Sequence, residues 1–220
     1  MDNRDQTTDP HAQMGARELK KIRNRQAILA AGQRVFAQIG YDAATVRDIV
    51  RESGLSPGTF YNYFQDKETV FQELMNGIVG DLRGRVQRAR GEARDAHGFL
   101  ANAFLAFFNM FRDQPELLQL VSRNQAVLRG LVADGQLVSA LFSELAADLE
   151  RAMDSGMMPR APVQWMTWVM AGAGFEILAQ MAKDPEIEPL AMANFLSDLF
   201  QGGMARVAGR ASVETSSAGK

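Results

Sequence analysis

TVRDIVRESGLSPGTFYNYFQDK, residues 45–67, is the stretch that decides the fold. It predicts two short helices joined by a tight turn. Thr45 and Asp48 have the spacing of a capping arrangement, in which side-chain oxygens accept hydrogen bonds from the unpaired N–H groups at a helix start. Gly54 follows the last apolar position of that helix and can take the left-handed conformation that ends it. The first helix is therefore expected to start at Thr45 and to stop at Gly54.

The second helix is expected over residues 56–64. Ser56 is a favourable N-cap, and Pro57 suits the first helical position because its missing N–H has no partner there. Phe60 and Phe64, four residues apart, lie on one face and are expected to anchor the helix in a core. The opposite face then carries Pro57, Gly58, Thr59, Tyr61 and Asn62. A short helix after a tight turn is typical of a helix-turn-helix, whose second helix reads DNA in the major groove.

The longer stretch SGLSPGTFYNYFQDKETVF, residues 53–71, resembles the signature of the TetR/AcrR family of bacterial transcriptional repressors. The matched region covers roughly residues 23–74, and its YxYFxxK core is more specific than a bare helix-turn-helix. The resemblance implies an all-α homodimer. It also implies a DNA-binding domain of three helices and a larger C-terminal domain that binds an inducer and the second subunit.

The resemblance and the side-chain chemistry together assign roles on DNA. Arg47, Thr59 and Tyr61 are expected to contact base edges, since Arg suits the guanine acceptors and the Thr methyl suits the thymine methyl. Hydroxyl, amide and ammonium donors near helix ends are expected to contact phosphates. Two alternatives stay open: Thr45 as a simple helix cap, and Tyr63 as a partly buried packing residue. The predicted DNA-binding set is Thr45, Arg47, Ser56, Pro57, Gly58, Thr59, Tyr61, Asn62, Tyr63 and Lys67.

Charge is distributed unevenly along the chain. Residues 15–67 hold nine Lys or Arg and five Asp or Glu, a net charge of +4, whereas the whole chain carries −2 and the remainder therefore −6. This asymmetry fits a basic DNA-contacting end on an acidic body. Arg23 and Arg25 in the basic run are candidates for phosphate or minor-groove contact, with a solvated helix start as the alternative.

The expected fold is all-α, with two domains between two disordered ends. No alternating apolar and polar run bounded by turn signals indicates a strand. Apolar periodicity, Gly and Pro predict helices near residues 18–39, 45–53, 56–64, 66–90, 99–112, 115–131, 136–155, 162–183 and 189–207. The predicted domain limits are 1–16 for a disordered arm, 17–66 for the helix-turn-helix DNA-binding domain, 67–208 for a ligand-binding and dimerisation domain, and 209–220 for a disordered tail.

The larger domain is expected to hold a ligand pocket. The segment FLANAFLAFFNMF, residues 99–111, places phenylalanines around a helix that also bears two amides seven residues apart. Aromatic and methionine side chains of the 162–183 helix add apolar surface that suits an apolar inducer. Ordinary core packing is the alternative for each of these residues. The predicted ligand-binding set is Asn102, Phe107, Asn109, Phe111, Trp165, Trp168 and Glu176.

The last two helices are expected to form the dimer interface. Residues 171–174 are small and allow helix backbones to approach closely, and the last helix offers an apolar stripe of Phe195, Leu196, Leu199 and Phe200. Paired with a second copy, these helices form a four-helix bundle. Two recognition helices one DNA turn apart then read a palindrome. Ligand binding is expected to favour a dimer with wrongly spaced DNA-reading helices.

Other classes of protein are less compatible with the sequence. The chain has two His, no Cys, no metal-binding motif and no phosphate-binding glycine loop, so no catalytic residue, metal site or cofactor is predicted and an enzyme is disfavoured. No apolar run is long enough to span a membrane, and a cytoplasmic location is expected. Two alternatives stay open: a transcriptional activator of the same fold, and a ligand-binding interaction protein that does not bind DNA.

Overall fold

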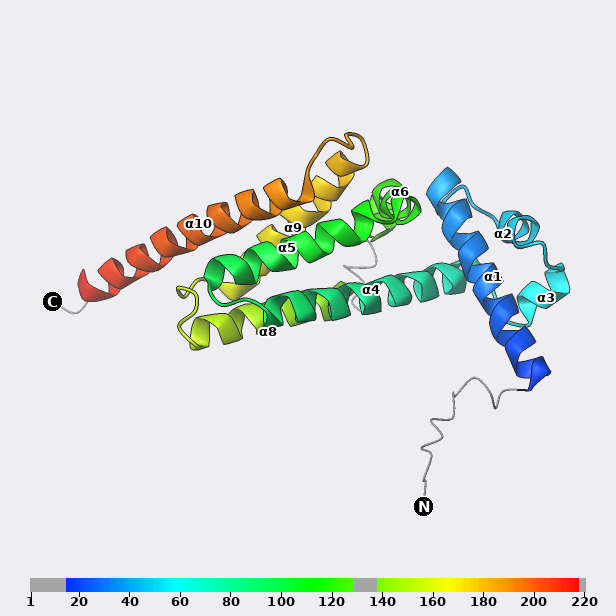
Figure 1. The fold of residues 1–220 in the computed structure, drawn as a ribbon, viewed down its shortest axis with the longest axis horizontal. Coiled ribbons are helices and arrows are strands. Elements are labelled where there is room, and N and C mark those ends of the chain that lie inside the picture. The colour runs from blue at the N-terminus through cyan, green and yellow to red at the C-terminus, as the bar shows by residue number, and fades with distance from the viewer. Residues whose placement is uncertain (1–14, 129–137, 218–220) are drawn as a thin grey trace, which may run out of the picture. The chain divides into compact units, whose positions relative to one another are not determined.

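The computed structural model describes residues 15–128 and 138–217, and helices are the only regular elements in these ranges (Figure 1). The chain divides into two compact units, residues 1–73 and 74–220. The helices are α1 Ala16–Ile39, α2 Val46–Ser53, α3 Pro57–Tyr61, α4 Lys67–Gly91, α5 Ala96–Arg112, α6 Pro115–Arg123, α8 Val138–Asp154, α9 Val163–Met181 and α10 Pro189–Ser217. The predicted all-α fold is confirmed.

The predicted caps and turn of the first unit are present. Thr45 is the N-cap of α2 in a reciprocal capping box with Asp48. Gly54 ends α2 in the left-handed conformation, with φ of 67°. Ser56 caps α3 by accepting a hydrogen bond from the backbone N–H of Thr59 at 3.1 Å. The turn between the two helices is therefore fixed by bonds that span three residues or fewer.

Four phenylalanines, Phe36, Phe60, Phe64 and Phe71, are the largest side chains in the core of the first unit. Phe36 and Phe71 meet edge to face with 5.2 Å between ring centroids, which joins α1 to the start of α4. Phe60 and Phe64, the predicted anchors of α3, are 0% and 2% exposed. The core also contains Ile28, Ala31, Val35, Ile49 and Val70.

The second unit is a layered bundle in which α5 packs against α6, α9 and α10, and α9 packs against α6 and α8. Figure 1 shows α5 lying alongside α10. Phe104 of α5 stacks on Phe200 of α10 with centroids 5.9 Å apart. Gly174 of α9 lies against Phe107, because a Cβ built on Gly174 would be only 3.3 Å from that ring. The helix α5, which carries Phe104 and Phe107, therefore lies at the centre of this unit.

Several helix boundaries differ from the prediction. The helix after Ser56 ends at Tyr61 and not at Phe64, because the chain turns there so that Asp66 can cap α4. The predicted 115–131 helix breaks at Asn124, whose side-chain amide donates to the Leu120 carbonyl at 2.7 Å and so competes with the helical backbone bonds. No proline follows Pro189, and α10 continues to Ser217, beyond the predicted end at residue 207.

The domain limits inferred from the sequence stay predictions. Within the predicted tail, residues 209–217 belong to α10, and 218–220 lie outside the described residues. Of the predicted arm, residues 1–14 lie outside the described residues and α1 begins at Ala16. None of the described helices is both long and apolar enough to cross a membrane.

Replacement of Asp66 tests how much the cap at the start of α4 contributes to the stability of the protein. Oδ1 of Asp66 accepts hydrogen bonds from the backbone N–H and the hydroxyl of Thr69, at 2.7 and 2.8 Å. Asp66→Ala is therefore expected to lower the free energy of unfolding by about 1 kcal/mol. The same bonds, the backbone one first, hold the pKa of Asp66 below its ordinary value of 3.8.

Because the pKa is lowered on folding, the deprotonated carboxylate favours the folded state. Its contribution is complete above the ordinary pKa and is lost as the pH falls through the lowered folded pKa. Urea unfolding from about pH 7 down to about pH 3 should show the difference between wild type and Asp66→Ala shrinking. A difference that stays constant over this range would contradict the assignment.

Candidate nucleic-acid interface and ligand pocket

The α3 helix has one buried and one open face. Phe60 is fully buried, whereas Tyr61, directly after it, is 60% exposed. Pro57, Gly58 and Asn62 are also exposed, and a Cβ built on Gly58 would meet only the Ser56 hydroxyl, at 4.0 Å. The structure therefore leaves four residues of the predicted DNA-binding set, Pro57, Gly58, Tyr61 and Asn62, exposed on α3 or directly after it.

Capping bonds occupy several hydroxyl groups of the predicted interface. The Thr45 hydroxyl donates to Asp48 and accepts from the Asp48 backbone N–H at 3.3 Å. Together with the Thr45 N–H, that hydroxyl holds the pKa of Asp48 below its ordinary value. The Ser56 and Thr59 hydroxyls lie 2.9 Å apart. Exposed Arg47 lies on α2 close to these caps in sequence.

Lys67 has a set of partners that the sequence did not predict. Its Nζ donates to the carbonyl oxygens of Tyr41, Ala44 and Asp42, at 2.7, 2.9 and 3.3 Å. It also lies 4.5 Å from the centroid of the Tyr41 ring, within cation–π range. The ammonium thus ties the start of α4 to the α1–α2 loop. Its predicted contact with phosphate stays a prediction.

Two arginines near the interface are held by acids. Both terminal nitrogens of Arg25 donate to the carboxylate of Glu73, and its guanidinium lies 5.4 Å from the Phe64 ring centroid. Arg34 donates to Glu52 at 2.6 Å. Arg25 therefore joins α1 to α4, while Arg23 and the exposed Lys20 and Lys21 remain on the surface of α1. Tyr63 is half-buried.

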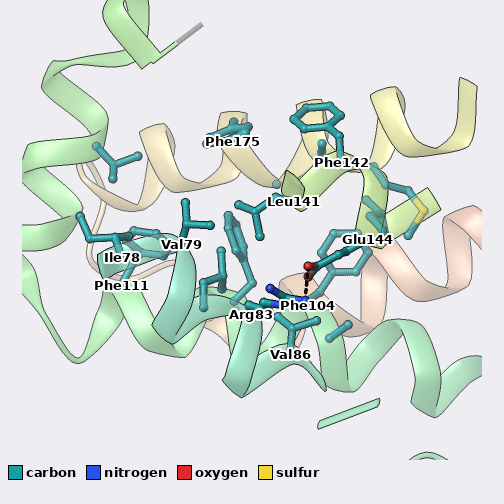
Figure 2. Close-up of a pocket in the computed structure, with 18 of the residues that line it drawn as sticks. Ile78, Val79, Arg83, Val86, Phe104, Phe111, Leu141, Phe142, Glu144 and Phe175 are labelled. Carbon is teal, nitrogen blue, oxygen red and sulfur yellow. Dashed lines mark ion pairs between the residues drawn. The ribbon is translucent and has the colours of Figure 1, made fainter. Parts of the chain in front are cut away.

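The second unit contains a cavity of about 200 Å³ between α4, α5, α8 and α9 (Figure 2). Most of the lining is aliphatic or aromatic. Figure 2 shows Ile78, Val79 and Phe111 at one end of the lining. The side chains that contribute include Met75, Ile78, Val79, Leu82, Phe104, Phe107, Phe111, Val121, Leu141, Phe142, Met170 and Phe175.

Charged side chains line the other end of the cavity. Arg83 of α4 donates to Glu144 of α8 at 2.7 Å, the pair drawn with a dashed line in Figure 2. Further along α4, Arg90 pairs with Asp148 of α8, and Asp148 also accepts from Arg151 of the same helix. Burial, reinforced by the nearby charge of Arg151, lowers the pKa of Arg90 to about 10, although Glu144 opposes the shift. Two ion pairs therefore link α4 to α8 along this part of the pocket.

The structure brings Phe107 and Phe111 of the predicted ligand-binding set to the cavity. The other five lie elsewhere. The Asn102 amide donates to the Ala89 carbonyl at 3.2 Å, and Asn109 is exposed. Trp165 and Trp168 are 65% and 53% exposed, and exposed Glu176 accepts from Gln180.

The charged residues of the pocket were missed because the sequence analysis treated each helix separately. Arg83 and Arg90 are seven residues apart, and Glu144 and Asp148 are four apart, so each pair lies on one face of its helix. Complementary charges at helical spacing on two helices are a signal for an interhelical contact. The sequence alone does not tell which pair of helices meets.

Residues 28–74 match the family described as "Bacterial regulatory proteins, tetR family". The chain is similar to the uncharacterized HTH-type transcriptional regulator YhgD of Bacillus subtilis, at 20% identity over 68% of this chain and 79% of that protein. It is also similar to the HTH-type transcriptional repressor AcnR of Corynebacterium efficiens, at 35% identity over 31% of this chain and 43% of that one.

Solved structures share the fold. The fatty acid degradation regulator FadR from Bacillus halodurans matches with a TM-score of 0.73 and 21% identity, over 82% of this chain and 96% of that one. FadR from Bacillus subtilis, solved in complex with stearoyl-CoA, matches with a TM-score of 0.71 and 21% identity, over 81% and 98%. The arrangement of helices described above is thus one that known regulators adopt.

Lys67→Met separates the two roles of this residue. Loss of the ammonium leaves three carbonyl oxygens without their donor, so the free energy of unfolding should fall by about 2 kcal/mol in urea denaturation. Exposed Lys20→Met, on α1, is the matched control and should have little effect. Unchanged stability of Lys67→Met would contradict the structural role.

The phosphate contact of Lys67 is tested by the slope of log affinity for DNA against log salt, because the loss of one phosphate contact reduces the magnitude of this slope by about 0.9.

Proposed function

We propose that this chain, whose residues 28–74 match the tetR family of bacterial regulatory proteins, is a transcriptional regulator that binds a palindromic DNA operator as a homodimer, represses transcription there, and is released by a small hydrophobic or aromatic ligand. The observation that carries the proposal is the open face of α3 around Tyr61, held outward by the buried Phe60.

The chemistry of the α3 surface supports base and phosphate contact. Tyr61 and Thr59 supply aromatic, methyl and hydroxyl groups of the kind that contact base edges in the major groove. Pro57 and Gly58 keep the start of α3 free of bulky side chains, which suits close approach to a DNA backbone. Arg47 adds an exposed guanidinium on the preceding helix. In the proposed complex, the DNA phosphates are contacted by Thr45, Ser56, Asn62, Tyr63 and Lys67.

The dimer is supported by large apolar side chains left exposed on α9 and α10. Trp165, Trp168 and Val169 are 65%, 53% and 58% exposed, and Phe195 and Leu199 are 57% and 56% exposed. A second copy laid on these helices buries them in a four-helix bundle. Removal of such side chains from water is the main driving force of association.

The predicted apolar stripe of α10 divides between two faces. Leu196 and Phe200 are 3% and 7% exposed and pack within the same chain, where Phe200 stacks on Phe104. The opposite face carries Phe195 and Leu199. Gly174 likewise packs against Phe107 of the same subunit. Gly172 is exposed and so stays available to a partner.

The ligand response is supported by the cavity beside α4. This helix runs from Lys67, whose ammonium ties it to the α1–α2 loop, to Arg90, which lines the cavity. A ligand that prefers one position of α4 over another shifts the population of dimers that fit the operator. FadR from Bacillus subtilis, which has a similar fold, was solved in complex with stearoyl-CoA, and this supports a ligand with an apolar chain.

Substitutions at two adjacent residues of α3 distinguish an effect on DNA recognition from an effect on folding stability. Tyr61→Ala removes a side chain that is 60% exposed, so it should change the preference among operator sequences and leave the free energy of unfolding nearly unchanged. Phe60→Ala opens a cavity in the core and should lower the free energy of unfolding by about 3 to 5 kcal/mol. Competition binding with variant operators and urea unfolding measure the two effects. Equal preference in Tyr61→Ala and wild type would remove Tyr61 from the interface.

The dimer surface is tested by placing charges on it. Phe195→Glu and Leu199→Glu together should convert the dimer to a monomer, because burial of two unpaired carboxylates opposes association. Ile39→Glu is the control, since Ile39 is 47% exposed on α1 of the first unit, whereas α9 and α10 belong to the second unit. Analytical ultracentrifugation gives the masses. A dimer that survives the double substitution would place the interface elsewhere.

The proposed function as a whole is tested by selecting bound duplexes from a random DNA pool. An enriched palindrome, with loss of binding as salt rises, is the expected result. Transcription from a promoter that carries the palindrome should fall when the protein is added; a rise would identify an activator. No enrichment at low salt would instead favour an interaction protein that does not bind DNA.

A further inference from the structure

Resting on the proposed function, we infer that the ligand is an amphipathic anion, whose apolar chain lies along the Phe107 and Phe111 end of the cavity and whose negatively charged head lies at Arg83 and Arg90. The arrangement of apolar and charged residues along the cavity, the balance of charge at its polar end and one buried donor without an acceptor all support this class of ligand.

The lining changes character along α4. Met75, Ile78, Val79 and Leu82 lie in the first part of the stretch and are apolar, whereas the later part contributes Arg83, Gln87 and Arg90 together with the apolar Val86. At about 1.5 Å per residue, the α4 stretch from Met75 to Arg90 is about 22 Å long. In Figure 2, Ile78 and Phe111 lie at one end, and Arg83 with Glu144 lies toward the other. An elongated ligand with one apolar and one polar end matches this division.

Two arginines and two carboxylates line the polar end of the cavity, and Arg151, which pairs with Asp148 outside the lining, adds one positive charge to this cluster. Glu144 pairs with Arg83, and Asp148 accepts from both Arg90 and Arg151. These contacts join three guanidinium groups to two carboxylates. Arg90 itself is largely buried, with 13% of its side chain exposed. An anionic head supplies the negative charge that this cluster lacks.

One buried atom at the polar end of the cavity is a donor without a partner in the part of the chain that the structure describes. Nε of Arg90 is buried and makes no hydrogen bond within the described residues. A buried N–H without an acceptor is unfavourable, and an oxygen of an anionic head satisfies it. A cationic head would instead face guanidinium groups, and its natural partners, Glu144 and Asp148, already accept from arginines. An uncharged head leaves the excess positive charge in place.

An anionic head competes with Glu144 for Arg83. Arg83 is the more accessible of the two lining arginines, with 54% of its side chain exposed, so its ion pair is the easier one to exchange. Exchange removes one of the two ion pairs that link α4 to α8. Ligand binding then acts directly on the helix whose first residue, Lys67, is tied to the α1–α2 loop.

The test uses ligands of one chain length and three heads. Decanoate, decan-1-ol and decylamine are added to the full-length wild-type protein, and the thermal unfolding midpoint and the dissociation constant are measured without DNA. Decanoate should raise the midpoint and bind more tightly than the other two. Decanoyl-CoA forms a further arm, because it carries its negative charge on phosphates and distinguishes a carboxylate from a phosphate-bearing head. Tighter binding of decylamine or decan-1-ol than of either anion overturns the inference.

Variants of the polar end sharpen the test. Arg83→Gln should weaken binding of the better anion by about tenfold. Arg85→Gln is the matched control, because Arg85 pairs with Asp81 on the same helix and does not line the cavity. Glu144→Gln should strengthen anion binding, since it removes the competing carboxylate. Equal weakening by Arg83→Gln and Arg85→Gln overturns the assignment of Arg83.

Operator binding is measured separately on the same proteins. If an operator is selected but anionic heads are not preferred, only this inference is contradicted and the proposed function stands. Anion binding without any selected operator would contradict the proposed function and keep the assignment of the pocket. The two failures are therefore distinguishable.

Discussion

A helix of five residues does not hold its shape alone in water, and the arrangement of the first unit depends on overcoming this limit. The α3 helix is Pro57–Tyr61. Its start is fixed by the Ser56 cap, and its position is fixed by Phe60, which is fully buried. Phe64 continues the anchor beyond the last helical residue. Side chains on the open face are therefore held by a core to which they contribute little.

The parts of the fold that could be predicted from the sequence depend on contacts close along the chain. The Thr45 and Ser56 caps and the left-handed Gly54 each involve residues no more than three apart, so residue type alone indicated them. Lys67 could not be assigned in the same way, because its carbonyl acceptors lie 23 to 26 residues away. The break at Asn124 was also missed, since an asparagine amide facing its own helix has no distinct pattern.

The pocket shows the same limit on a larger scale. Phe107 and Phe111 could be predicted because one aromatic-rich helix made them conspicuous. Trp165 and Trp168 were equally conspicuous, yet they are exposed, since large apolar side chains also serve surfaces that bind other chains. Arg83 with Glu144, and Arg90 with Asp148, join helices more than 50 residues apart in sequence. Such partners become evident only when the helices are placed together.

The open space at Gly58 has a consequence for how this protein can evolve. A Cβ there would meet only the Ser56 hydroxyl, at 4.0 Å, and Tyr61 is 60% exposed, with its ring meeting the buried Phe60 ring edge to face. Mutations at these positions change the outer surface at little cost to the free energy of unfolding. Duplicated copies of such a gene can therefore diverge in what this surface recognises while each intermediate sequence still folds. The exposed positions of the short helix can therefore vary while the scaffold beneath them stays constant.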